Sequence, residues 1–275
     1  MPRNQTRTTA DEQSRFCWQG FGIPLNDSWH PTVLRGGFRR GYVQLERSSE
    51  GLLQIRWEPA KQTPNLNERA QDYLRLLRQS AKKRKRSLHT HSDGSEFRWH
   101  GELKGYGGLL WDEESRRVFL IERSGPSRDS FKQEARAILR GFESFTGDVL
   151  PWQVLGLRLR LPARLAMRRF DALAGRIAVR FTSRIETVVA ERWSLADRLL
   201  AQTSLAEWGA KATRLQPAAE HGDIARYEGA ARLPLGLLGV RKTGIAQHLA
   251  EENALVTLVR VGRGSAPLEE WVIAG

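Results

Sequence analysis

The sequence has almost no cysteine, since Cys17 is the only one among 275 residues. A single thiol excludes a disulfide within the chain and a zinc site built from several thiolates. Long apolar runs are absent too, and none approaches the roughly 20 residues that a membrane-spanning helix needs. These absences predict a protein of a reducing cytoplasm without a membrane span.

The start of the chain also lacks the features of a targeting signal. The segment MPRNQTRTTADEQSR contains no apolar stretch of the kind that a secretory signal requires. Polar residues at a chain end are typical of disorder. We therefore expect residues 1–16 to form a disordered tail.

Motifs of common enzymes are missing as well. The chain contains no GxSxG, HExxH or GxxxxGK pattern, each of which marks a particular catalytic or phosphate-binding geometry. The segment GYGGLL (residues 105–110) lacks the spacing of a dinucleotide-binding loop and is interpreted as a turn between strands. The sequence thus predicts no catalytic residue, no cofactor and a protein that is not an enzyme.

What is present is a globular composition with a local excess of positive charge. Hydrophobic residues make up 40% and charged residues 27% of the chain, which is enough to bury a proper core. The net charge is +13, and residues 61–94 and 151–193 carry +6 each. Arginine supplies 36 of the 44 cations, a bias that GC-rich bacterial coding produces by itself, so total charge alone is a weak argument.

Two stretches of the chain share one pattern, which predicts a duplication. Residues 18–59 and 152–194 both contain an alternating segment closed by Pro24 or Pro162, followed by a second alternating segment after Gly41 or Gly175. Alternation with a period of two predicts half-buried strands. We expect one domain over residues 17–147 and a degenerate second copy over 151–275. One long mixed sheet with coincidental similarity is the alternative.

Each copy is expected to continue with a helix after its first strands. From Leu66 onward the apolar residues have helical spacing, and in the second copy Ser194 could cap a helix that begins there. Ser130 and Gln133 form a potential capping box for a further helix that reaches Phe145. The sequence therefore predicts the α+β class, with two tandem domains that each pack helices on an antiparallel sheet.

The order of these elements resembles a known superfamily. A strand that ends in FGIP, Trp29 soon after it, and a closing segment ILRGFESF are similar to PsbP-like and Mog-like proteins. The resemblance covers most of residues 18–147 and, more faintly, 152–275. It implies an antiparallel sandwich that binds a protein partner without catalysis.

The stretch KKRKRSLHTHSDGS contains two candidate sites. The five cations indicate either a solvated surface turn or contact with an anionic partner such as a phosphate backbone; they are Lys82, Lys83, Arg84, Lys85 and Arg86. The segment LHTHSDGS resembles the opening motif of PHP-type metallohydrolases, with His89, His91 and Asp93 as metal ligands. The further histidine clusters of such enzymes are missing, so a solvated connecting loop is the favoured interpretation.

A second basic surface is predicted from two alternating segments. In LRLRLP and RIAVRF the apolar residues and the arginines fall on opposite faces of a strand. If these two strands were neighbours, one sheet surface would carry four arginines, namely Arg158, Arg160, Arg176 and Arg180. Such a surface could bind nucleic acid or an acidic protein, or simply keep a partly exposed sheet face solvated.

These patterns predict a cytoplasmic, non-catalytic accessory or scaffold protein. Its expected partner is a protein with an acidic surface, or a larger complex, bound through the basic residues. The alternative is an accessory factor that contacts the phosphate backbone of RNA or DNA. A metal-dependent hydrolase that uses the HTHSD segment is the third hypothesis.

Overall fold

A computed structural model describes residues 15–26, 28–47, 51–126, 131–230, 240–263 and 266–273. The chain divides into two compact units, Met1–Thr146 and Gly147–Gly275. Strands hold 55% of the described residues and helices 19%. Of the expected tail, residues 1–14 lie outside the described residues, and Arg15 and Phe16 begin the first strand.

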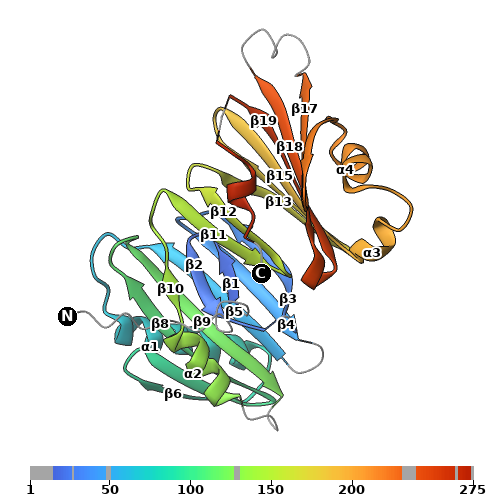
Figure 1. The fold of residues 1–275 in the computed structure, drawn as a ribbon. Helices are drawn as coiled ribbons and strands as arrows, with labels where there is room; N and C mark the ends of the chain where they lie inside the picture. Colours follow the sequence, from blue (N-terminus) through green and yellow to red (C-terminus); the bar gives the residue numbers. More distant parts are fainter. Residues whose placement is uncertain are drawn as a thin grey trace, which may run out of the picture. The chain divides into compact units, whose positions relative to one another are not determined.

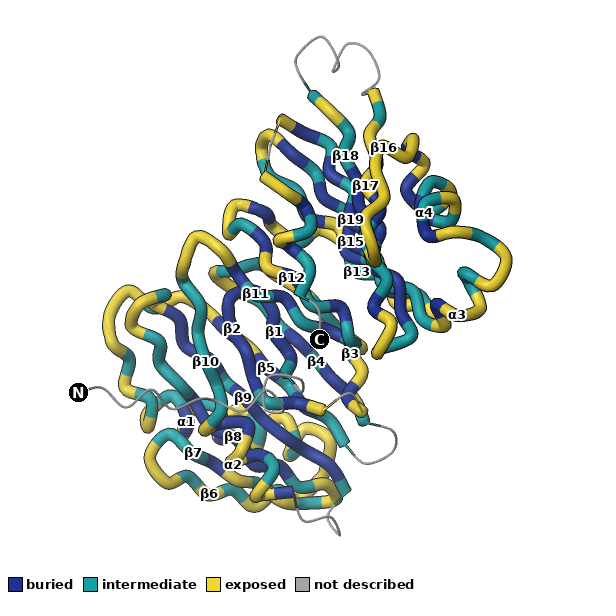
Figure 2. Tube along the Cα trace, viewed as in Figure 1, coloured by how far each residue is buried: buried dark blue, intermediate teal, exposed yellow. Residues whose placement is uncertain are grey.

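The first unit is built on an antiparallel sheet with the order β3-β4-β5-β9-β8-β7-β6 (Figure 1). Its strands are β3 (His30–Gly36), β4 (Gly41–Arg47), β5 (Gly51–Pro59), β6 (His89–Asp93), β7 (Glu96–His100), β8 (Leu103–Asp112) and β9 (Arg117–Pro126). The central strand β9 is largely buried, β5 buries alternate residues, and the edge strand β6 is mostly exposed (Figure 2).

Short strands and two helices cover this sheet. The strands β1 (Arg15–Trp18), β2 (Phe21–Pro24) and β10 (Glu143–Ser144) pair in the order β10-β2-β1. Phe21 of β2 packs on Trp57 and Phe119, with ring centroids 5.2 and 5.5 Å apart. Helix α1 (Leu66–Lys83) packs on the opposite face through Ala70 and Leu74. Helix α2 (Lys132–Arg140) lies on the face of the short strands.

The second unit has the same strand order in its main sheet, β13-β14-β15-β19-β18-β17-β16. Its strands are β13 (Ala166–Leu173), β14 (Arg176–Thr182), β15 (Glu186–Ser194), β16 (Gln216–His221), β17 (Ile224–Ala230), β18 (Arg241–Leu249) and β19 (Ala254–Gly262). The hairpin of β11 (Val149–Val154) and β12 (Leu157–Pro162) packs on it, with the rings of Trp152 and Phe181 4.9 Å apart. A common origin of the two units stays a prediction from the sequence.

The helices of the second unit are shorter than those of the first. They are α3 (Ala196–Leu199), α4 (Leu205–Thr213) and the 3₁₀ turns η3 (Ala250–Glu252) and η4 (Glu269–Trp271). Ser204 and Glu207 form a capping box at the start of α4. No helix within the described ranges is both long and apolar enough to cross a membrane.

The predicted α+β class is wrong, because the protein is mostly β. One face of each main sheet carries a layer of short strands, joined in the first unit by α2, since the alternating segments before Pro24 and Pro162 form a second strand layer. The described residues contain four α-helices, and only α1 exceeds nine residues. Helices therefore supplement a strand-built core instead of forming a layer of their own.

Several elements differ from their prediction in extent or in type. The helix expected up to Phe145 ends at Arg140, because Gly141 lies against Pro24, where a Cβ would come within 2.6 Å of the ring. Ser130 of the predicted capping box lies outside the described residues. Ser194 ends β15 instead of capping a helix. GYGGLL is part of the strand β8, and its glycines make room for the rings of Phe97 and Trp99.

A buried arginine fixes the last segment of each unit to its sheet. Arg123 of β9 lies between Trp29 and Phe131, 4.8 and 4.6 Å from the ring centroids, and pairs with Glu134 of α2 at 3.2 Å. Arg260 of β19 lies 5.6 Å from the ring centroid of Trp271 in η4, and donates to the Ala266 carbonyl. In the first unit this anchor sets the position of α2 over the sheet.

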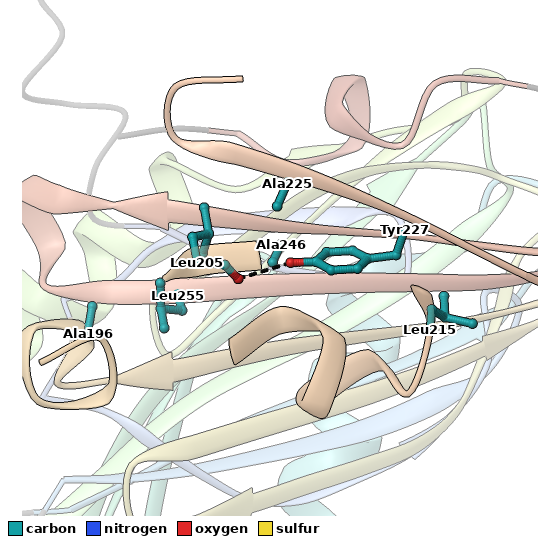
Figure 3. Close-up of a cluster of buried hydrophobic side chains, with 7 residues drawn as sticks. All are labelled: Ala196, Leu205, Leu215, Ala225, Tyr227, Ala246 and Leu255. Carbon is teal, nitrogen blue, oxygen red and sulfur yellow. Dashed lines mark hydrogen bonds between the residues drawn. The ribbon is translucent and has the colours of Figure 1, made fainter. Parts of the chain in front are cut away.

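The core of the second unit lies under α4. Figure 3 shows Tyr227 among small and branched apolar side chains, with its hydroxyl donating to the Leu205 carbonyl at 3.0 Å. Gly209 of α4 lies directly over this ring. A Cβ at that position would be 2.0 Å from the Tyr227 hydroxyl oxygen and 2.9 Å from the Ala246 Cβ.

We expect the variant Gly209→Ala to be less stable than the unaltered chain by about 1–2 kcal/mol. Helix propensity alone would favour alanine by about 1 kcal/mol, but α4 must move away from the sheet to accommodate the methyl group. Urea denaturation followed by tryptophan fluorescence measures the change. Lys211→Ala, at an exposed position of the same helix, serves as the control, and a Gly209→Ala variant at least as stable as this control would contradict the packing.

Candidate anion-binding site

The five cations at the end of α1 form an exposed basic segment, defined as Lys82–Arg86. Lys82 and Lys83 lie in the last turn of the helix, and Lys85 has a left-handed backbone with φ 55° that turns the chain toward β6. Arg86 pairs with Glu102 at 3.1 Å. Within the described part of the chain, Lys82–Lys85 have no carboxylate within ion-pair distance.

The segment after these cations is an edge strand, so the predicted loop is wrong. HTHSD forms β6 and pairs with β7 through a turn at Gly94, which has φ 59°. This pairing places His100 directly opposite His89, and their rings stack with centroids 4.7 Å apart. No local sequence pattern links His100 to His89, because only the strand register brings the two rings together.

A hollow of about 470 Å³ lies where β6, β7, β8 and the start of α2 meet. We call it the histidine hollow; the cationic and imidazole side chains of its lining are His89, His91, Arg98, His100, Lys104 and Lys132. Tyr106 and Phe131 add aromatic rings, and the Lys132 and Lys104 ammonium groups lie 5.9 and 5.5 Å from their centroids.

Carboxylates on the same face are held outside the hollow. None is among its lining residues. Glu96 accepts a hydrogen bond from the Tyr106 hydroxyl and pairs with Arg136 at 3.5 Å. Asp93 lies at the exposed turn end of β6. The hollow therefore combines three cations and three imidazoles, a set of donors that suits an anion.

The metal-site hypothesis gains no support from this geometry. His89, His91 and Asp93 alternate along one face of β6 and are exposed. Among the residues with a described placement, no group of three or more histidine, cysteine or acidic side chains could hold a metal ion. The histidines lie beside Arg98 and Lys104 instead, and such neighbours disfavour a bound cation.

The predicted surface of four arginines does not form in the second unit. Arg158 and Arg160 lie on β12, which pairs with β11, whereas Arg176 and Arg180 lie on β14, which pairs with β13 and β15. Two of the four are neutralised, because Arg158 pairs with Glu252 and Arg176 pairs with Glu191. Arg160 and Arg180 are exposed but belong to different sheets.

Trp57 and Trp193, which stand near the ends of the two similar stretches 18–59 and 152–194, do not occupy equivalent positions. Trp57 is buried on the side of the short strands and donates to the Gly37 carbonyl at 2.9 Å. Trp193 faces α4 and packs edge-on against Trp208, with centroids 5.9 Å apart. A shift of one residue along a strand turns its side chains to the other face of the sheet. The similarity of the two sequences does not reveal such a shift.

A second groove of about 790 Å³ lies between α1 and the strands β4 and β5. Its lining carries both signs of charge, and Arg69 and Glu58 neutralise each other at 2.8 Å.

Cys17 is buried in β1, and burial raises the pKa of its thiol to about 11, so it is a thiol at neutral pH. Neither feature has the unbalanced charge of the histidine hollow.

No protein-family model matches the chain, and neither a curated protein nor a solved structure is significantly similar to it.

Proposed function

We propose that the first unit binds the phosphate backbone of a nucleic acid through the basic segment, in a non-catalytic accessory role. The observation that carries this proposal is the density of unbalanced charge, with four consecutive exposed cations, Lys82–Lys85, that lack an ion-pair partner among the described residues. Like charges this close repel one another. A polyanion relieves the repulsion and gains free energy by releasing its own counterions.

The composition of this surface favours a nucleic acid over an acidic protein. Protein interfaces draw most of their binding free energy from buried aromatic and arginine anchors, and lysine is depleted in them. The basic segment has three lysines and no apolar side chain. The histidine hollow beside it adds further cations and imidazoles. An acidic protein partner is the competing hypothesis that the experiment has to separate.

The test replaces the five residues of the basic segment by glutamine and measures binding of a single-stranded oligonucleotide with a 5′-hydroxyl end. For the unaltered chain, log K is expected to fall linearly with log salt concentration, by about 0.7 for each phosphate contacted. The variant should reduce this slope by about 3, since four unpaired cations are lost, and weaken binding at low salt roughly 100-fold. Fluorescence anisotropy measures both quantities.

The matched control replaces Lys211 and Arg214 by glutamine at the end of α4, the corresponding helix end of the second unit. Both side chains are exposed, and we expect the salt dependence to stay unchanged. The proposal is contradicted if the control variant loses as much affinity as the basic-segment variant, or if the unaltered chain binds neither RNA nor DNA at low salt. Retention of an acidic protein by the basic segment after nuclease treatment would favour the competing hypothesis.

A further inference from the structure

We propose that the histidine hollow binds the terminal phosphate monoester of a nucleic-acid strand whose backbone lies along the basic segment. The inference rests on the proposed function, because it assigns the end of the same strand to a second, built site. It concerns the first unit alone, where every residue involved belongs to one compact unit.

Three positive charges converge on the hollow from three different elements. Arg98 comes from β7, Lys104 from β8 and Lys132 from α2. The position of α2 is fixed by the ion pair of the buried Arg123 with Glu134, so Lys132 is held at the hollow by the fold. These three cations come from separate elements and surround a hollow, so the fold determines where they lie. A row of solvated charges along one strand has no such arrangement.

The imidazoles add hydrogen-bond donors next to these charges. The rings of His89 and His100 stack at an interplanar angle of 17°, and His91 lies opposite Arg98 in the strand register. Imidazole N–H groups and a guanidinium together can donate to several oxygens of one phosphate. The volume of about 470 Å³ is within the range of small-ligand sites, roughly 300–1,000 Å³.

The basic segment ends beside the turn that borders the hollow. The ion pair of Arg86 and Glu102 joins the end of that segment to the turn between β7 and β8. At the same turn, a Cβ on Gly101 would come within 2.6 Å of the Ser87 carbonyl oxygen, so the two chain segments lie in close contact. His100 and Lys104 flank this turn. A strand that follows the cations of α1 reaches the hollow by passing this turn at the edge of the sheet, because α1 and α2 lie on opposite faces.

A terminal phosphate fits these donors better than an internal one. A monoester carries up to two negative charges and three free oxygens, whereas an internal diester has one charge and two free oxygens. The hollow has three cations and three imidazoles, and no carboxylate among its lining residues. The unbalanced charge is thus matched more closely by the dianion.

The experiment compares two oligonucleotides of one sequence, with a 5′-phosphate or a 5′-hydroxyl end, for binding to the full chain. We expect the phosphorylated strand to bind about tenfold more tightly. The double variant Arg98→Gln, Lys132→Gln should abolish this preference and bind the 5′-hydroxyl strand nearly as before. Both side chains are exposed, so folding should be preserved. Arg140→Gln, on an exposed position of α2, is the control that retains the preference.

The outcomes separate the two proposals. Equal binding of both strands with the steep salt dependence retained overturns the terminal site and leaves the backbone proposal in place. A free nucleoside 5′-monophosphate that binds as tightly as the strand, and is unaffected by substitution of the basic segment, overturns the inference because the ligand is then a small molecule. No binding of either strand overturns both.

Discussion

Replacement of Arg117 by methionine is expected to lower the free energy of unfolding of the first unit by about 3–4 kcal/mol. The guanidinium is 1% exposed and donates to the carbonyls of Gln19, Gly20 and Phe38 at 2.7–2.8 Å. It thereby ties β9 to two separate turns. Burial lowers the pKa of Arg117 to about 10, so the group stays charged at neutral pH. Its removal leaves three carbonyl groups without these donors.

The neighbouring residue provides the control for this prediction. Arg116 is exposed in the turn before β9, and Arg116→Met should change stability by less than about 0.5 kcal/mol. Arg117→Lys should fall between the two, since one ammonium group cannot reach both turns. Urea denaturation gives the free energies, and hydrogen exchange of the β1 and β2 amides shows where protection is lost. Equal midpoints for the two methionine variants would contradict the proposed role.

The second large loss of stability is expected from substitution of Glu122, whose carboxyl group is buried in the middle of β9. Its Oε2 accepts hydrogen bonds from the Tyr73 hydroxyl at 2.7 Å and from the Trp99 indole at 3.0 Å. Glu122→Ala leaves both donors without this acceptor and opens a cavity under α1. We expect a loss of about 3 kcal/mol in the free energy of unfolding. Glu122→Gln retains an acceptor oxygen and should be at least as stable as the unaltered chain at pH 7.

The pH dependence of stability tests the same residue independently. Burial raises the pKa of Glu122 above its ordinary value of 4.5, although the bonds from Trp99 and Tyr73 act against this. Because the folded state holds this proton more tightly than the unfolded state, protonation of Glu122 stabilises the fold. This contribution to the free energy of unfolding is fully present below about pH 4.5. It is lost as pH rises through the raised pKa.

The glutamine variant should lack this part of the pH dependence. Its stability relative to the unaltered chain is therefore expected to increase as pH rises from 4.5 toward neutrality. Glu113→Gln, at an exposed position between β8 and β9, should leave the pH profile unchanged. A constant difference between Glu122→Gln and the unaltered chain across this range would contradict a raised pKa.

The local patterns of the sequence predicted many elements but not their layers. The apolar spacing after Leu66 predicts α1, which begins at that residue and ends at Lys83. The segments closed by Pro24 and Pro162 are strands, but they form a second strand layer where the sequence predicts helices. The period of an alternating segment indicates that one face is buried, and it does not indicate what covers that face.

The candidate site was predictable only where its residues form a local motif, as in Lys82–Arg86 and the pair His89 and His91. Lys82–Arg86 is visible as five consecutive letters, and its position at the end of a helix follows from the spacing of α1. His100, Lys104 and Lys132 of the histidine hollow carry no local signal, since they come from three separate elements. A hairpin prediction around Gly94 would have aligned His100 with His89, because the turn fixes the register of the two strands.

The sequence by itself determined the alternating strands, the amphipathic helix α1 and the dense cations, because these depend on residues close together in the chain. Only the tertiary structure decided which charges remain unbalanced. Arg158 and Arg176 pair with Glu252 and Glu191, whereas Lys82–Lys85 have no carboxylate within ion-pair distance among the described residues. Strand pairing between distant segments sets these distances, and electrostatic interactions depend on distance and burial rather than on order in the chain.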